Sequence, residues 1–177
     1  NFPQEKDRRI IVRKLDEANL EGTIKLLLTN GGVVGIIVNT GSRAQNIFER
    51  LAQLFGNDVK LLHSKFIDTD RVSKEKHLME IIGKNARRPQ RGIIIGTQVL
   101  EQSLDIDFDV LITDLCPMDL LLQRVGRLHR HDISRLEGLA QPLLYIMGES
   151  ETLEFEQGSA AIYGDYLLAR TQSLLPK

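Results

Sequence analysis

Short runs of apolar, mostly β-branched residues recur along the chain, and longer stretches with a helical apolar period separate them. The apolar runs are continuous, whereas a strand with one solvent-exposed face would alternate apolar and polar residues. Continuous runs indicate strands that are buried on both faces, as in a parallel sheet. The predicted strands are 10–12, 33–38, 59–62, 93–95, 110–112 and 143–147.

The stretches between these runs carry the signals of helix ends. Ser42 and Gln45 have the spacing of a capping box, and Gly56 stands where that helix would end. Residues 68–70 are suited to cap a second helix, and Pro117 suits the first turn of a third. The residues expected on the inner faces are Ile47, Phe48, Leu51, Leu54 and Phe55; Val72, Leu78, Met79, Ile81 and Ile82; and Leu120, Leu121, Leu122 and Val125.

This alternation of strands and helices predicts the fold class. We expect an α/β fold, namely a doubly wound, mainly parallel sheet with helices on both faces and right-handed crossovers. Residues 1–147 are predicted to form the main domain. Residues 148–177, acidic over 149–156 and helical in pattern over 161–175, are predicted to be a C-terminal helical extension or the start of a linker to an accessory domain.

The composition narrows the class of protein. The 177 residues are 42% hydrophobic and 27% charged, which is ordinary for a globular domain and argues against disorder. The single cysteine, Cys116, cannot form an internal disulfide, which favours a reducing compartment such as the cytoplasm. No apolar run approaches the roughly 20 residues of a membrane span, so we expect no membrane association. A net charge of −1 still allows a local basic patch.

Polar or small residues follow four of the predicted strands. In open parallel sheets, ligands gather at the carboxyl ends of the strands, so chemistry is expected in these segments. They are residues 39–43, 63–66, 96–98 and 113–117. Gly96 and Thr97 offer backbone N–H groups and a hydroxyl to a phosphate, although such a pair is more often only a turn.

Three arginines recur at every third position in QRVGRLHR, residues 123–130. This spacing is expected to keep Arg124, Arg127 and Arg130 near one side of a helix. Three neighbouring guanidinium groups repel one another, so a phosphate would relieve that cost, and arginine is well suited to stabilising a phosphoryl transition state. The alternative is a solvated basic helix end, which the helix dipole favours.

Taken together, the segments resemble the second RecA-like domain of superfamily 2 helicases. GIIVNTGSRAQ (35–45) is similar to motif IV, LLHSKF (61–66) to the short motif after it, GTQVLEQSLDID (96–107) to motif V and QRVGRLHR to motif VI. The segments HSKF, TQVLEQSLDIDFD and LCPMDLLLQRVGRLHRH most closely resemble the CRISPR-associated helicase–nuclease of type I interference systems. The resemblance covers about residues 8–147.

The resemblance implies roles for residues at an ATP site. Arg127 and Arg130 would be arginine fingers that reach the γ-phosphate, and Gln123 would contact the nucleotide or its water. Arg124 would brace the acidic motif of the partner domain. Asp105 falls where motif V touches the ribose or phosphate, although on the residues alone it could equally cap a turn. Glu101 and Gln102 also have two interpretations. They are either relays between the ATP and DNA sites or solvated side chains.

The resemblance also implies contacts with nucleic acid. Short polar side chains and backbone donors hold a phosphate backbone without reading bases, as a sequence-tolerant translocase requires. The candidates are Thr97, Gln98, Asn39, Thr40, Arg43 and His63. Arg43 could instead be a surface arginine, and His63 a structural histidine. The basic loop GKNARRPQR (83–91) either follows a phosphate backbone or is simply solvated. His129 and His131 lack further ligands at metal-site spacing, so no metal site is expected.

Half of an ATPase site is absent from the sequence. Residues 16–19, DEAN, mimic an acidic helicase box, but no G-x-x-x-x-G-K-[S/T] phosphate loop precedes them. We therefore interpret DEAN as a helix start or linker. ATP and Mg²⁺ are expected to be shared with a first RecA-like domain, and the nuclease metal is expected elsewhere in a parent chain. The chain alone is expected neither to hydrolyse ATP nor to cut DNA.

The family implies the remaining partners, which are single-stranded DNA and a CRISPR surveillance complex. It also implies translocation from 3′ to 5′. Two other functions remain open. The chain could belong to a general superfamily 2 DNA or RNA helicase without a nuclease, or it could be a non-catalytic nucleic-acid binding module. Retention of Arg127, Arg130, Gln123 and Thr97 argues against the second of these.

Overall fold

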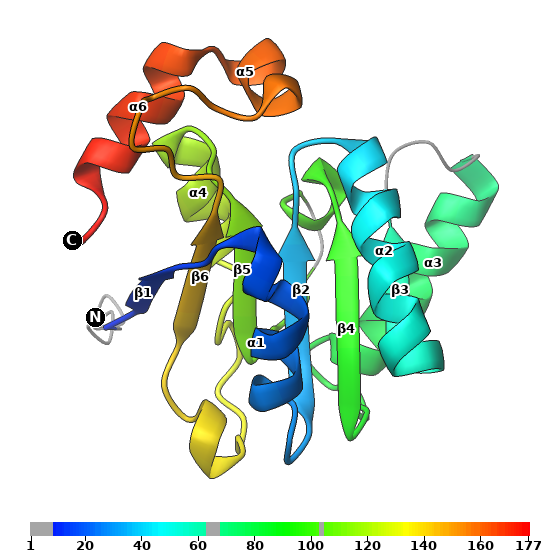
Figure 1. Ribbon diagram of the computed structural model, residues 1–177. Coiled ribbons are helices and arrows are strands. Elements are labelled where there is room, and N and C mark those ends of the chain that lie inside the picture. Colours follow the sequence, from blue (N-terminus) through cyan, green and yellow to red (C-terminus); the bar gives the residue numbers. More distant parts are fainter. Residues whose placement is uncertain (1–8, 63–67, 103–104) are drawn as a thin grey trace, which may run out of the picture.

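A single parallel sheet forms the centre of the molecule (Figure 1). The computed structural model describes residues 9–62, 68–102 and 105–177. Within these residues the sheet has six strands in the order β1-β6-β5-β2-β4-β3, and every neighbouring pair is parallel. The strands are β1 (Ile11–Lys14), β2 (Gly32–Ile37), β3 (Val59–Leu62), β4 (Arg91–Gly96), β5 (Val110–Asp114) and β6 (Leu143–Met147).

Helices cover both faces of this sheet, which confirms the predicted doubly wound α/β fold. The first face carries α1 (Leu20–Leu27) and α2 (Gly41–Phe55), and the second carries α3 (Asp68–Ile82) and α4 (Met118–Val125). Two further helices, α5 (Gln157–Tyr163) and α6 (Asp165–Leu174), follow β6. Single 3₁₀ turns are Glu17–Asn19, Gly56–Asp58, Gln98–Leu100 and Glu137–Leu139.

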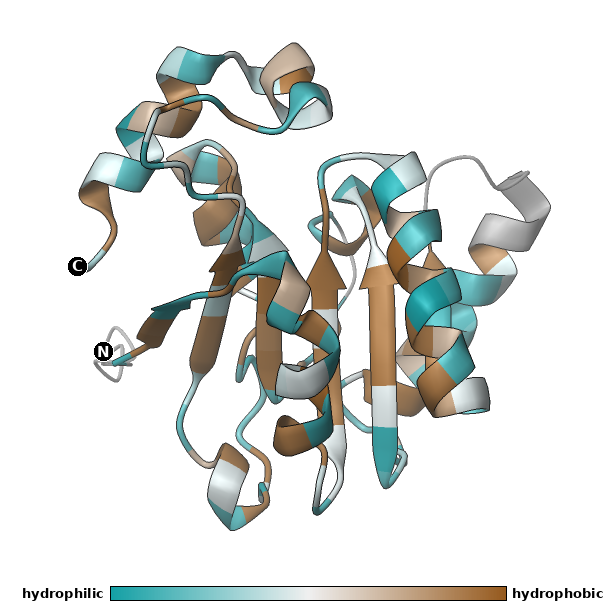
Figure 2. Cartoon of the chain, viewed as in Figure 1, coloured by the Kyte–Doolittle hydropathy of each residue, from teal (hydrophilic) through white to brown (hydrophobic). Residues whose placement is uncertain are grey.

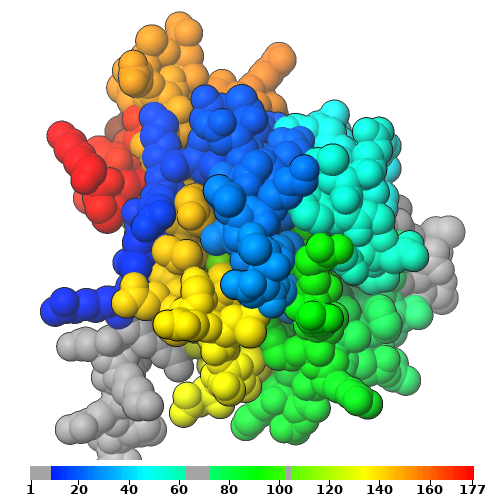
Figure 3. Space-filling view, turned by 60° about the horizontal axis from the view of Figure 1, so that its bottom comes forward, coloured from blue at the N-terminus to red at the C-terminus, as the bar shows by residue number. Residues whose placement is uncertain are grey.

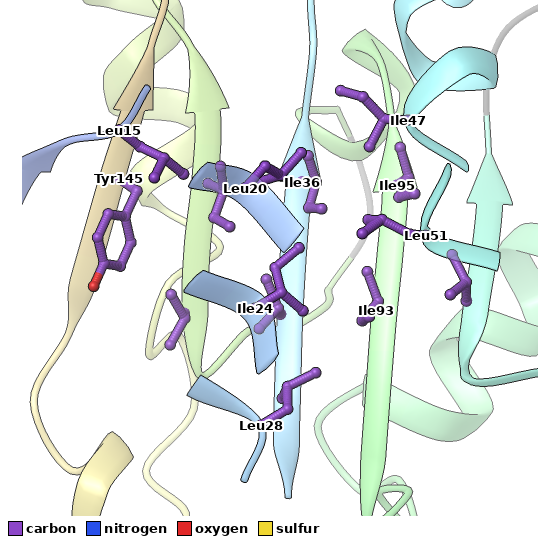
Figure 4. Packing of buried hydrophobic residues seen from close by; sticks show 14 of the residues in the cluster. Leu15, Leu20, Ile24, Leu28, Ile36, Ile47, Leu51, Ile93, Ile95 and Tyr145 are labelled. Carbon is purple, nitrogen blue, oxygen red and sulfur yellow. The ribbon is translucent and has the colours of Figure 1, made fainter. Parts of the chain in front are cut away.

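Apolar strand residues point alternately into two cores, one on each face of the sheet. Figure 4 shows the first core, where Leu20 and Ile24 of α1 and Ile47 of α2 lie over the strands. The second core contains Ile94, Leu111, Ile146, Leu78 and Leu121, among others. The strands are accordingly apolar along most of their length (Figure 2). Because both faces are covered, β2, β4 and β5 are buried and show the continuous apolar runs that the sequence has.

The helix boundaries differ in part from the prediction. The N-cap of α2 is Thr40 rather than Ser42, because the Thr40 hydroxyl accepts the backbone N–H of Arg43 at 3.3 Å. Gly56 follows α2 as predicted and adopts a positive φ of 55°. Leu54, Val72 and Leu122 are wrongly predicted as inner residues, since they are 50%, 64% and 63% exposed.

The C-terminal residues lie over the carboxyl edge of the sheet (Figure 1). The helical pattern over 161–175 is broken at Gly164, which has a φ of +76° and separates α5 from α6. Leu168 of α6 is fully buried and belongs to the second core. Gln172 and Ser150 exchange hydrogen bonds of 2.8 and 2.9 Å, which fix α6 to the segment after β6.

Candidate functional site

Arg124 lies in the interior of the domain at the end of α4. Its side chain is fully buried, and its Nε and Nη2 atoms each lie 2.6 Å from Oε1 of Glu101, which is buried as well. The same guanidinium donates to Thr113 Oγ1 at 2.8 Å and to Asn39 Oδ1 at 2.9 Å. Weaker bonds reach the carbonyl oxygens of Ile37 and Asp114. The predicted contact of Arg124 with ATP or with a partner domain is therefore not what this structure shows. Arg124 instead connects the ends of β2 and β5 to motif V.

Asn39, a predicted phosphate contact, is also used inside the domain. It is 1% exposed, and its Nδ2 donates to the carbonyl of Leu115 and to Oγ of Ser159, both at 2.9 Å. Its Oδ1 accepts from Arg124, and its backbone N–H donates to Asp114. Every polar atom of the Asn39 side chain thus has an internal partner, so the amide is not available to a phosphate in this structure.

Arg43 is held by two carboxylates at the start of α2. Its Nε and Nη2 donate to the two oxygens of Asp114 at 2.9 and 2.7 Å, and its Nη1 donates to Glu17 at 2.9 Å. Burial lowers the pKa of Arg43, but the hydrogen bonds and charges of Asp114 and Glu17 outweigh burial and raise it overall. Arg43 is therefore neither the free surface arginine nor the unpaired phosphate ligand that the sequence suggested. Asp16 caps the turn that begins with Glu17, which confirms DEAN as a helix start.

The remaining nucleic-acid candidates meet at the carboxyl ends of β2 and β4. Thr97 is 1% exposed, and within the described residues its hydroxyl has no hydrogen-bond partner. Gln98 is partly buried and donates to the backbone carbonyl of Asn39 at 3.2 Å. Thr40 lies beside them and faces Gly158 of the C-terminal segment. Thr40, Thr97 and Gln98 therefore stay predicted phosphate contacts, while His63 lies outside the described residues.

Arg127 and Arg130 lie beyond the end of α4, so they do not share a helix side with Arg124. Arg127 is partly buried, and its Nη2 donates to the carbonyl of Glu101 at 2.9 Å. Its Nε is buried without a partner among the described residues. Burial and the neighbouring charge of Arg130 lower the pKa of Arg127. Among the described residues, the bond to the Glu101 carbonyl is thus accompanied by no carboxylate partner, and such a guanidinium can pair with an anion.

Arg130 is more exposed and pairs with Asp105. Its Nε lies 2.6 Å from Asp105 Oδ1, which also lies 2.8 Å from His131 Nε2. These bonds from His131 and Arg130 lower the pKa of Asp105. Asp105, Arg130 and His131 line a groove of about 930 Å³ together with Lys84 and other residues. Gln123 and Gln102 are exposed and remain predicted site residues.

Three charged residues that sequence reasoning did not select, Asp107, Asp109 and Arg135, form a largely buried cluster with Arg88 of the basic loop at the amino end of β5. Asp107 and Asp109 lie just before β5, and they pair with Arg88 and Arg135. In the sequence, the two aspartates are marked by the alternation of acidic and apolar residues in DIDFD, residues 105–109. The basic loop is accordingly divided, because Arg88 belongs to the cluster and Arg91 pairs with Asp58 at 2.6 Å. Lys84 and Arg87 are exposed.

Two further features concern metals and membranes. Within residues 9–62, 68–102 and 105–177, no group of three or more His, Cys, Asp or Glu side chains is arranged to hold a metal ion. Across the same residues, every helix is too short or too polar to cross a membrane.

Comparison with known proteins adds to this geometry. A family model described as CRISPR-associated nuclease/helicase Cas3, C-terminal, matches residues 30–133. A CRISPR-associated nuclease/helicase Cas3 of Streptococcus thermophilus is 54% identical over 176 residues, which are 99% of this chain and 19% of that protein. The Cas3 of Thermus thermophilus is 35% identical, with 91% and 22% covered. The chain thus spans about a fifth of these relatives.

Solved structures agree with the sequence relatives. The crystal structure of T. fusca Cas3-ADP is similar, with a TM-score of 0.89, 34% identity, and coverage of 96% of this chain and 22% of that one. A chain of a CRISPR RNA-guided surveillance complex, pre-nicking, has a TM-score of 0.85 and 31% identity, with 96% and 22% covered. The match to the family model, the closely related sequences and the shared fold lead to one conclusion: the chain belongs to the CRISPR-associated nuclease/helicase Cas3 family, as its RecA-like helicase C-terminal domain.

Proposed function

We propose that this domain is half of an ATP-dependent translocase on single-stranded DNA, with Arg127 and Arg130 as its arginine fingers. The observation that carries the proposal is the state of Arg127. Its guanidinium is partly buried and lies close to a second arginine. Among the described residues its Nη2 donates to a backbone carbonyl, and its Nε has no partner. An arrangement of this kind favours an anion such as the γ-phosphate, whose charge grows in the transition state.

The second finger, Arg130, would exchange its ion pair with Asp105 for the nucleotide. Asp105 accepts bonds from both Arg130 and His131, so it occupies the place of an anion between them. Asp105, Gln102 and Gln123 would then contact the nucleotide, as predicted. ATP and Mg²⁺ would be shared with a first RecA-like domain, so the 177-residue chain alone is expected neither to hydrolyse ATP nor to cut DNA.

The DNA side of the proposal rests on Thr97, Gln98 and Thr40. The Thr97 hydroxyl is buried without a partner within the described residues, and a phosphate contact would satisfy it. The cytoplasm is the proposed compartment. Type I CRISPR interference is the proposed setting, because relatives are named Cas3 and a neighbour is part of a surveillance complex.

Mutation of the fingers tests this function in a longer Cas3 polypeptide that joins this domain to a first RecA-like domain. Arg127→Ala is expected to lower ATP turnover by about 10³-fold or more, because a finger stabilises charge that develops only in the transition state. Affinity for single-stranded DNA should stay within about twofold. The matched control is Arg170→Ala, since Arg170 is exposed on α6, away from the groove. Unchanged turnover in Arg127→Ala would contradict the finger assignment, and a non-catalytic module would then be the better account.

A further inference from the structure

The buried cluster of Asp107, Asp109, Arg88 and Arg135 lies at the amino end of the sheet, opposite the edge where the strands end. Segments 85–92 and 130–140 meet there, as Figure 3 shows from that side. The Asp107 side chain is fully buried, and those of Asp109 and Arg135 are 8% and 6% exposed. Arg135 Nη2 reaches both carboxylate oxygens of Asp107, at 3.0 and 2.8 Å, and its Nη1 donates to Asp109. Arg88 Nη2 donates to Asp109 at 3.0 Å.

This cluster is bonded to the backbone that carries Arg130. Oδ1 of Asp107 accepts the backbone N–H of Arg130 at 3.2 Å. Phe108 donates its backbone N–H to the carbonyl of Arg127 at 2.8 Å, and its own carbonyl accepts the N–H of His129 at 3.0 Å. Residues 107–109 and 127–130 therefore run together as a short paired segment.

The paired segment holds an unfavourable backbone conformation directly before Arg130. His129 has a φ of +49°, in the left-handed region that costs a residue with a Cβ atom about 1–2 kcal/mol. Such a conformation persists only where the surroundings determine it. His129 is buried, and its Nε2 lies 3.0 Å from the carbonyl oxygen of Asp109. The positive φ of His129 thus fixes the backbone directly before Arg130, after α4 has ended at Val125.

Stability alone accounts poorly for this group of charges, of which Asp107, Asp109 and Arg135 are nearly enclosed while the Arg88 side chain is 20% exposed. Removing charges from water costs several kcal/mol per ion, and apolar residues of similar volume often serve a fold as well or better. Apolar residues could not accept the Arg130 N–H, however, nor fix the carboxylate that does so. The bond from Asp107 to the Arg130 backbone is therefore the property that distinguishes this cluster from a packed core.

We infer that Asp107 and Arg135 are positioning residues that hold the finger Arg130 in its reactive orientation. Arg135 orients the Asp107 carboxylate through its Nη2, which donates to both carboxylate oxygens, and Asp107 fixes the backbone of Arg130 through its N–H. Neither residue touches ATP in this inference. It rests on the proposed function, because positioning matters for turnover only if Arg130 is a finger.

The test uses a longer Cas3 polypeptide that contains both RecA-like domains, with ATP and single-stranded DNA as substrates. Arg135→Gln is expected to lower kcat by about 10- to 100-fold, because a displacement of about 1 Å in a positioned group costs that much. KM for ATP should change by less than about threefold. Arg135→Lys keeps the charge but cannot contact Asp107 and Asp109 with two separate nitrogen atoms, so a smaller fall in kcat is expected. This milder variant keeps the inference testable should Arg135→Gln fail to fold.

Two comparisons separate positioning from general loss of stability. Leu51→Ala removes a fully buried side chain on the opposite face of the sheet and should destabilise the domain without lowering kcat at temperatures where it stays folded. In an Arg130→Lys background, Arg135→Gln should lower kcat by less than about twofold, because both changes act through one side chain.

The outcomes distinguish this inference from the function beneath it. If Arg130→Lys leaves kcat unchanged, the finger assignment fails, and the positioning inference fails with it. If Arg130→Lys lowers kcat but Arg135→Gln and Arg135→Lys do not, only the positioning inference is overturned. The positioning inference alone is also overturned if the fold losses of kcat from Arg135→Gln and Arg130→Lys multiply in the double variant.

Discussion

Replacement of Arg124 is the sharpest test of how the site is built, because this side chain links three parts of the domain. Arg124→Met keeps most of the volume of the side chain and removes its charge and all five donors. The perturbation leaves the Glu101 carboxylate, which is 1% exposed, without its ion-pair partner. It also removes the donor to Asn39 Oδ1 at 2.9 Å.

The magnitude follows from these losses. Leaving one partner of a buried ion pair uncompensated costs about 3–5 kcal/mol. An unsatisfied buried acceptor such as Asn39 Oδ1 adds about 1–3 kcal/mol. Thr113 loses one bond but keeps its donation to the carbonyl of Asp114, so its loss is smaller. We expect Arg124→Met to lower the free energy of unfolding by about 4–8 kcal/mol, a large part of the 5–15 kcal/mol typical of a domain.

The double variant separates the charge effect from simple loss of packing. Arg124→Met with Glu101→Gln removes both charges, and the remaining cost is mainly the unsatisfied Asn39 acceptor at about 1–3 kcal/mol. The double variant should therefore be more stable than Arg124→Met alone. Urea denaturation, followed by circular dichroism, measures the free energy of unfolding of the unsubstituted 177-residue chain, of Arg124→Met, of Glu101→Gln alone and of the double variant. If the losses of the two single variants simply add in the double variant, the pair is not coupled and this reasoning is refuted.

Two further predictions concern the fold around the site. Gly35→Ala places a Cβ 2.4 Å from the ring of Phe108, so it should lower the free energy of unfolding by about 1–3 kcal/mol; Gly22→Ala in α1, whose Cβ would meet no atom within 4 Å, should raise it by up to about 1 kcal/mol. Equal urea midpoints for the two variants would contradict the described packing. Burial and the charge of Arg135 lower the pKa of His129 below its usual 6.5, so the unfolded chain takes up a proton first and stability should fall as pH drops below about 6.5. His129→Asn tolerates the left-handed backbone and should reduce this loss; an identical slope of stability against pH would show that other groups cause it.

The strands and the polar carboxyl edge of the sheet were predictable from local pattern. Continuous apolar runs occur where both faces of a strand are covered, and polar residues follow those runs where parallel strands end together. This is why the fold class, the alternation of elements and the segments around Thr40 and Thr97 could be inferred from the sequence. The motif spacing also carried the family resemblance, which the comparisons confirm.

The separate fates of the three arginines were decided only by the tertiary structure. In the sequence, Arg124, Arg127 and Arg130 form one regular stripe. In the structure, α4 ends at Val125, and the turn at His129 leads the chain away from the helix. As a result one arginine is enclosed, one is partly buried and one lines a groove. The spacing of residues within one segment does not show where a helix ends when that end depends on pairing with a distant segment, as residues 127–130 pair with residues 107–109.

The same reason explains why two candidate contacts have partners inside the domain in this structure. Asn39 is bonded to Ser159, 120 residues later in the chain, and Arg43 is bonded to Asp114, 71 residues later. Asp107 accepts a hydrogen bond from Arg135, 28 residues later, and the apolar pattern gives no sign of this pairing. The sequence by itself determined which residues form the sheet and where its polar edge lies, because burial leaves a periodic trace. Only the tertiary structure decided which polar side chains hold the domain together and which remain free for a ligand. Hydrogen bonds between distant segments leave no periodic pattern in the sequence.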